Sequence, residues 1–278
     1  MNKFLIAFFA SSLFLFACNG DKRSGSQTEL PDDSADTLAV AADSLVDAVA
    51  ETPVPRAADE LFDDFFFNFV ANRRMQTERI HFPLPVYKGE ELSHVEKKAW
   101  KMERFFMTQG YYTLIFDSRK QMELVKDTAV DHVVVEKIDL VKKKVKQYTF
   151  QRANGLWQLE SIHHLATSET KNASFIDFYC HFASDSAFQL KSLNDPVAFS
   201  GPDPDDDFKQ IEGVISPDTW PAFAPELPSE MIYNIIYGQN ASEGNRKIFL
   251  IRGIANGFEI EMDFAKRGGK WYLMRLNT

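Results

Sequence analysis

Aromatic residues recur at helical spacing in two distant segments of the chain. They stand at positions i, i+3, i+4 and i+7 in both, as Phe62, Phe65, Phe66 and Phe69 and as Phe175, Phe178, Tyr179 and Phe182. Residues at this spacing share one face of a helix. The pattern predicts two amphipathic helices with their aromatic stripes in a core, and Asp59 and Ser174 are the expected N-caps.

A second helix is expected after each of these. Residues 93–96 have the spacing of a capping box, and apolar residues follow on one helical face as far as Phe106. The counterpart is expected to begin at Phe208, after Asp207.

Alternating apolar and polar residues close each segment, and this period is that of a strand with one buried face. The clearest case is 258–264, which lies between the turn sequences Asn256-Gly257 and Gly268-Gly269. Strands are expected at 111–116, 133–140, 145–152 and 157–162, and again at 231–237, 248–251, 258–264 and 271–276. The expected fold class is α+β, with helices first and a curved antiparallel sheet wrapped around them.

The two segments are copies of one unit. At an offset of 113 residues, 62–83 aligns with 175–196 without a gap and with six identities, and Trp157 matches Trp271 at an offset of 114. Matching starts and ends predict a tandem duplication. We expect a first domain at 58–168 and a second at 169–278.

The N-terminus has the pattern of a targeting segment. Lys3 precedes an apolar stretch at 4–16 that is too short to span a bilayer, so 1–17 is expected to be a cleaved signal peptide. Residues 15–18, Leu-Phe-Ala-Cys, resemble the bacterial lipobox, which implies that Cys18 becomes an acylated, palmitate-bearing first residue. The alternative is an ordinary secretory signal in which Cys18 has no role.

Residues 18–57 are expected to be a disordered acidic tether. Positions 19–57 contain no Phe, Trp or Tyr and have a net charge of -5, so they cannot bury enough surface to offset the entropy of ordering. The expected location is the cell envelope, at the periplasmic side of the outer membrane, with surface exposure left open.

Composition narrows the classes of function. The chain is 45% apolar and 26% charged with a net charge of -9, which describes a folded acidic protein and excludes a basic nucleic-acid binder. Two cysteines are too few for a disulfide framework or a four-thiolate zinc site. No nucleotide-loop, zinc-protease or hydrolase motif occurs, so no cofactor is expected.

Several groups of polar residues partly match the sequence patterns of calcium, anion, thiol or metal sites. Asp203, Asp205 and Asp207 imitate the start of a calcium loop, but Phe208 and Val214 replace its required Gly and Glu. The alternative is a solvated, helix-capping loop. The lysines at 142–144 and 146 form a solvated turn or contact an anion or headgroup. Cys180 and His181 are neighbours on a helix and point in different directions, which disfavours a thiol nucleophile with a histidine base. His163 and His164 are neighbours on a strand and face opposite sides, which disfavours a metal site built from the pair.

Longer motifs resemble those of a known family. They are Phe62–Phe65, 79–85, 111–116 and 148–152 in the first unit, with 237–239 among the matches in the second. These residues resemble an uncharacterised Bacteroidetes lipoprotein family whose members are similar to nuclear-transport-factor-like (SnoaL-like, cystatin-like) domains. The resemblance implies a cone-shaped half-barrel, which encloses a pocket in some relatives and dimerises through its sheet in others. Two tandem copies would then form an intramolecular pseudo-dimer.

The resemblance gives Asp64 and Asp177 a second interpretation. Cone-fold isomerases use a pocket carboxylate as a general base, and Tyr179 would be the matching hydroxyl donor. Each Asp directly precedes a stripe Phe, however, and therefore lies one helical step off the buried line, where a surface carboxylate is the simpler expectation.

Together these patterns favour a non-enzymatic envelope lipoprotein that binds a small apolar ligand or an envelope protein. One alternative is a cone-fold lyase or isomerase. The other is a structural scaffold whose cones are filled by phenylalanine side chains.

Overall fold

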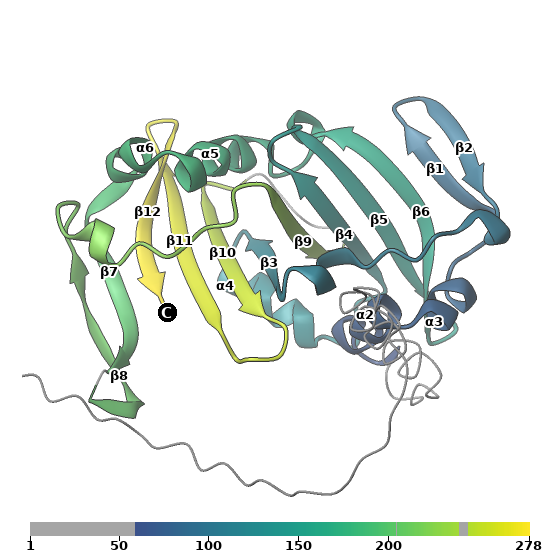
Figure 1. Cartoon of the computed structure of the whole chain (residues 1–278), viewed down its shortest axis with the longest axis horizontal. Helices are drawn as coiled ribbons and strands as arrows, with labels where there is room; N and C mark the ends of the chain where they lie inside the picture. The colour runs from purple at the N-terminus through teal and green to yellow at the C-terminus, as the bar shows by residue number, and fades with distance from the viewer. Residues whose placement is uncertain (1–58, 204, 239–243) are drawn as a thin grey trace, which may run out of the picture. The chain divides into compact units, whose positions relative to one another are not determined.

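The computed structural model describes residues 59–203, 205–238 and 244–278, all within one compact unit, although the side chains of 207 and 208 are left out. The signal peptide, Cys18 and the tether lie outside the described residues. Figure 1 shows an α+β architecture built on two curved sheets. The expected fold class is confirmed.

Each sheet has six strands. In spatial order the first consists of β2 (Glu91–Val95), β1 (Leu84–Lys88), β6 (Leu156–Ala166), β5 (Lys144–Ala153), β4 (His132–Asp139) and β9 (Met231–Tyr237). The second consists of β3 (Tyr111–Phe116), β10 (Arg246–Gly253), β11 (Glu259–Arg267), β12 (Lys270–Asn277), β7 (Leu193–Asp203) and β8 (Asp206–Ile215). The pairing is antiparallel except at β1 with β6 and β7 with β12, which are parallel.

The helices are short. They are α2 (Phe62–Ala71), α3 (Arg73–Glu78), α4 (Arg119–Met122), α5 (Ala173–Ser184) and α6 (Ser186–Lys191). The 3-10 turns are η2 (Lys97–Ala99), η3 (Phe105–Thr108), η4 (Glu123–Lys126), η5 (Thr167–Glu169) and η6 (Trp220–Ala222).

The two predicted aromatic helices are α2 and α5. All eight stripe residues are buried, which confirms the pattern. The N-caps are Leu61 and Asn172 rather than Asp59 and Ser174. Asp59 is instead paired with Arg79, and the Ser174 side chain lies inside the first turn of α5.

Equivalent contacts in both halves support the duplication. Asn72 caps α3 and Asp185 caps α6, each through its side-chain oxygen. The indole of Trp100 donates to Gln76, and the indole of Trp220 donates to Gln189, 113 residues after Gln76.

The prediction of a second helix in each unit is wrong. Residues 91–95 form β2, where Ser93 Oγ donates to the carbonyl of Val86 on β1 instead of capping a helix. Only the short turns η2 and η3 follow, because Trp100 binds Gln76 and Phe106 packs against the α2 stripe. In the second unit, Asp206–Ile215 is β8, which forms a hairpin with β7. Pairing with a neighbouring strand therefore outweighs local helix signals in both places.

Each half contributes one strand to the sheet of the other half. The strand at 111–116, β3, pairs with β10, and the strand at 231–237, β9, pairs with β4. The sequence pattern found both strands but did not show that they are exchanged. The domain boundary at 168/169 stays a prediction, and the topology adds that a strand crosses it in each direction.

Side chains join the two sheets where β3 lies beside β9 (Figure 1). Thr113 Oγ1 donates to the carbonyl of Tyr233 and accepts its N–H at 3.1 Å. Asn234 Oδ1 accepts the N–H of Ile115 at 2.8 Å. Backbone groups at these two sheet edges are thus satisfied by side chains in place of a strand ladder.

The exchange mixes the two cores. The core around α2 includes five residues from the second half, and the core around α5 includes four from the first. They are Tyr233, Ile235, Tyr237, Ile248 and Leu250, and Ile115, Ile138, Leu140 and Val145. Each core is therefore complete only when both halves are present.

This arrangement predicts that neither half folds alone. Fragments 58–168 and 169–278, expressed separately, should lack cooperative unfolding, because each would miss a strand and part of its core. Mixing them should restore the near-ultraviolet circular dichroism of the intact chain. A cooperative thermal transition in either isolated fragment would contradict the prediction.

A carboxyl group is buried close to the joined edges. Glu136 on β4 is 1% exposed and accepts hydrogen bonds from Asn234 Nδ2 at 2.9 Å and Gln147 Nε2 at 2.8 Å. Burial raises the pKa of Glu136, and the two amide donors oppose this only in part.

The raised pKa of Glu136 predicts a stability that falls with increasing pH. Below about pH 4.3, the unfolded-state pKa, both states hold the proton. Between that value and the folded-state pKa only the folded state holds it, so this group lowers the free energy of unfolding by up to about 1.4 kcal/mol per pH unit. Urea titrations from pH 4 to 8 should show that Glu136→Gln loses this slope while Glu90→Gln, at an exposed turn, keeps it. Equal slopes in both variants would argue against it.

Candidate functional site

Aromatic rings fill the interior of both cones. The Phe150 ring lies 5.3 to 5.9 Å from all four rings of the α2 stripe. In the second half, Phe264 contacts Phe175, Phe178 and Phe182 at 5.3 to 5.6 Å. An apolar ligand inside either cone would have to displace these rings, which favours the scaffold alternative on this point.

An open groove of about 550 Å³ lies against the second cone, between α5, α6 and the β11–β12 turn. In Figure 1, α5 and α6 lie across the ends of β11 and β12. The groove is lined by Ser174, Asp177, Phe178 and His181 from α5, Phe188 and Lys191 from α6, Ser192, and Gly269, Lys270, Trp271 and Tyr272. Its volume falls in the range of small-molecule sites.

Ser174 fixes one wall of this groove. Its Oγ accepts a hydrogen bond from Lys266 Nζ at 2.8 Å and another from Trp271 Nε1 at 3.1 Å. The Lys266 ammonium also lies 5.6 Å from the centre of the Trp271 ring. Helix α5 and strands β11 and β12 are therefore held together at the site by side-chain contacts.

Charges in the groove are mostly positive. Lys191 and Lys270 are exposed, and Asp177 is the one acidic lining residue. The side chain of Asp177 is 68% exposed, and its Oδ1 lies 3.5 Å from Lys143 Nζ in the β4–β5 turn. The predicted lysine turn thus lies next to this site.

The corresponding place in the first half has an ion pair. Arg79, which aligns with Ser192, makes a two-bond ion pair with Asp59 at 3.0 and 2.8 Å and approaches the carbonyl of Trp157 at 3.4 Å. Trp157 aligns with Trp271, and its buried indole nitrogen has no hydrogen-bond partner among the described residues. One copy of the duplicated unit therefore has an open groove, and the other has an internal ion pair.

The two candidate general bases, one in each unit, both lie on exposed helix surfaces. Asp64 is exposed on α2, and Asp177 is exposed on α5. Tyr179 is fully buried and donates to the carbonyl of Pro228 at 3.1 Å, and burial raises the pKa of its hydroxyl. Neither carboxylate lies in a water-excluding pocket with a hydroxyl donor, so a catalytic role for the three remains an untested prediction.

The aspartates of the imitated calcium loop lie at the β7–β8 hairpin. Asp203 Oδ1 accepts the N–H of Asp205 at 3.0 Å, and the side chain of Asp207 lies outside the description. Within the described ranges, no three His, Cys, Asp or Glu side chains come together as metal ligands would.

The thiol and histidine candidates Cys180, His181 and His163 each contact a neighbouring backbone or aromatic group. Cys180 Sγ donates to the carbonyl of Leu140 at 3.8 Å, and burial raises the pKa of this thiol. His181 contacts the ring of Phe188 instead. His163 stacks on Tyr87 with ring centres 4.5 Å apart.

Sequence reasoning missed three polar clusters because their members are far apart in the chain. Asp63, the neighbour of Asp64, accepts from the Tyr237 hydroxyl, and burial raises the pKa of its carboxyl group. The Glu103 carboxylate accepts from the Tyr148 hydroxyl at 2.6 Å and lies 3.3 and 3.2 Å from the ammonium groups of Lys137 and Lys146.

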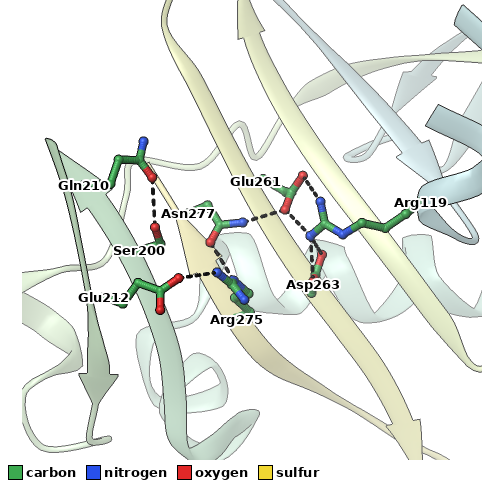
Figure 2. A network of polar contacts seen from close by, with 8 residues as sticks. All are labelled: Arg119, Ser200, Gln210, Glu212, Glu261, Asp263, Arg275 and Asn277. Atoms are coloured by element: carbon green, nitrogen blue, oxygen red, sulfur yellow. Dashed lines mark hydrogen bonds and ion pairs between the residues drawn. The ribbon is translucent and has the colours of Figure 1, made fainter. Parts of the chain in front are cut away.

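The third cluster crosses the face of the second sheet that turns away from α5 (Figure 2). Glu261 accepts two hydrogen bonds from Arg119 and a third from Asn277 at 2.6 Å. The network continues through Arg275 to Glu212 on β8 at 3.8 Å. Its members satisfy one another, so the network ties α4 to the sheet.

The targeting predictions cannot be placed in the structure, because Cys18 lies outside the described residues. None of the helices in the described part has the length and apolarity needed to cross a membrane.

Comparisons with known proteins agree with this architecture. No curated protein matches the chain. An NTF2-like protein from Bacteroides fragilis, known from a crystal structure, is 42% identical, with a TM-score of 0.73, and the match covers 81% of this chain and 98% of that one. The nuclear-transport-factor-like fold implied by the sequence motifs is thereby confirmed. The profile of a domain of unknown function, DUF4348, matches residues 41–278, and the chain therefore belongs to the DUF4348 family.

Proposed function

We propose that this protein is a non-enzymatic binding module of the cell envelope, lipid-anchored through Cys18, whose ligand occupies the groove between α5, α6 and the β11–β12 turn. The observation that carries the proposal is the difference between the two copies of the unit. The second copy has the open groove, and the first copy has the Asp59–Arg79 ion pair at the position that aligns with the groove residue Ser192.

The lining of the groove suits binding better than catalysis. Phe178, Phe188 and Trp271 offer apolar surface, and polar groups surround them, which is the usual composition of a ligand site. Asp177, the acidic residue of the lining, is exposed to solvent and is not enclosed in a water-excluding pocket.

The proposed anchor rests on the sequence. Acyl chains contribute about 0.8 kcal/mol per buried methylene, so lipidation at Cys18 would hold the protein at a membrane through the acidic tether. The groove would then face the aqueous side, available to a ligand or to an envelope protein.

Groove binding predicts uptake of a neutral apolar dye. N-phenyl-1-naphthylamine should bind residues 19–278, which keep the compact unit, with an increase in fluorescence. Phe188→Ala should weaken binding about tenfold or more, because the ring contributes roughly 1.5 kcal/mol of apolar contact. Phe258→Ala, at an exposed ring outside the groove, is the matched control and should leave the affinity unchanged. Absence of dye binding, or equal loss in both variants, would refute the proposed site.

The anchor predicts that the full-length chain, expressed in a bacterial host, incorporates labelled palmitate. Cys18→Ala should abolish the label because the thiol that accepts the lipid is gone, whereas Cys180→Ala should keep it. The measurement is gel fluorescence after conjugation of an azide-bearing palmitate. Equal labelling of wild type and Cys18→Ala would refute lipidation at this position.

A further inference from the structure

We propose that the ligand of this groove is an amphiphile with an anionic head, a carboxylate or a phosphate, and an apolar tail. The inference rests on the proposed function and adds the chemical class of the ligand. It follows from three features of the groove: its excess of cations, a hydroxyl hydrogen left for an acceptor, and an aromatic wall.

The first feature is charge. Lys191 and Lys270 line the groove against one acidic side chain, Asp177, which is itself paired with Lys143. Lys266 adds a further positive charge beside Ser174. Opposite charges a few ångströms apart near a protein surface attract each other. An anionic group therefore fits this groove better than a cationic one.

The second feature is the hydrogen-bonding capacity of the Ser174 hydroxyl. A serine oxygen has one hydrogen to donate and two lone pairs to accept with. Lys266 Nζ and Trp271 Nε1 use both acceptor positions, at 2.8 and 3.1 Å. The hydroxyl hydrogen is then left for an acceptor in the groove, such as a carboxylate or phosphate oxygen.

The third feature is the aromatic surface between these polar groups. Phe178 and Trp271 are 7% and 5% exposed, and Phe188 is half-buried, so together they form a firm apolar wall rather than a set of free side chains. An alkyl or acyl chain lying against this wall would be removed from water while its head stays beside the lysines.

The first copy of the unit supplies an internal comparison. At the positions that align with Ser174, Lys191 and Lys270, it has Leu61, Glu78 and Leu156. The two lining lysines and the hydroxyl are therefore absent from the aligned positions of the first copy, and its Arg79 is paired with Asp59. Open volume and anion-binding groups occur together in the second copy.

The test compares four probes on residues 19–278, below their micelle concentrations, by the change in tryptophan fluorescence and by calorimetry. Dodecyl phosphate and dodecanoate have the proposed head and tail, dodecanol has the tail alone, and inorganic phosphate has the head alone. At least one anionic amphiphile should bind ten times or more tightly than dodecanol, and more than a hundred times more tightly than phosphate. The ratio of the two anionic probes shows which head is preferred.

Two variants replace a lysine of the groove with the residue at the aligned position of the first copy. Lys191→Glu and Lys270→Leu should each weaken the binding of the preferred anionic probe tenfold or more, while dodecanol and the neutral dye change less than twofold. Lys97→Glu, at an exposed position in η2, makes the same charge change outside the groove and should have no effect. Thermal unfolding of each variant confirms that the fold is kept.

The outcomes separate this inference from the proposed function. Equal affinity for dodecanol and both anionic probes, or equal effects of Lys97→Glu and Lys191→Glu, would overturn the anionic head while leaving groove binding intact. Phosphate binding as tightly as dodecyl phosphate would overturn the tail. If neither the dye nor any amphiphile binds, the proposed function fails together with the inference.

Discussion

The contact between β3 and β9 is the constraint on which the rest of the molecule depends. Each strand pairs with the sheet of the other half, and Thr113 and Asn234 then satisfy backbone groups across the gap between them. Unpaired sheet edges are costly when buried and prone to aggregation when exposed. At the edges formed by β3 and β9 the side-chain bonds reduce both problems, and the exchange turns two repeated units into one body with mixed cores.

Within that body, duplication has allowed the copies to diverge. Both keep the aromatic stripe and the Gln–Trp contact that brace the helices against the sheet. They differ at the end of the cone, where Arg79 and Asp59 form an ion pair in one copy, and Ser192 and two lysines line an open groove in the other. A filled interior leaves chemistry to such outer surfaces, because ligands cannot enter cores packed with phenylalanine rings.

The parts predicted well from the sequence were those with a local physical signature. The stripes of α2 and α5 and the alternation in β11 record directly which face of each element is buried. The predictions failed at 93–106 and at Phe208, where helix signals were real but pairing of β2 with β1 and of β8 with β7 satisfied more backbone groups. Asp177 and the lysine turn were both noted as candidates, yet their proximity depended on the fold.

The sequence by itself determined the duplication, the helices, most strands and the family resemblance, because periodicity and spacing are properties of neighbouring residues. Only the tertiary structure decided which sheet β3 and β9 join, since an apolar strand fits either sheet equally well by pattern. It also decided where the groove lies and that Asp59 and Arg79 meet as an ion pair, because these contacts join side chains that are 20 or more residues apart in the chain.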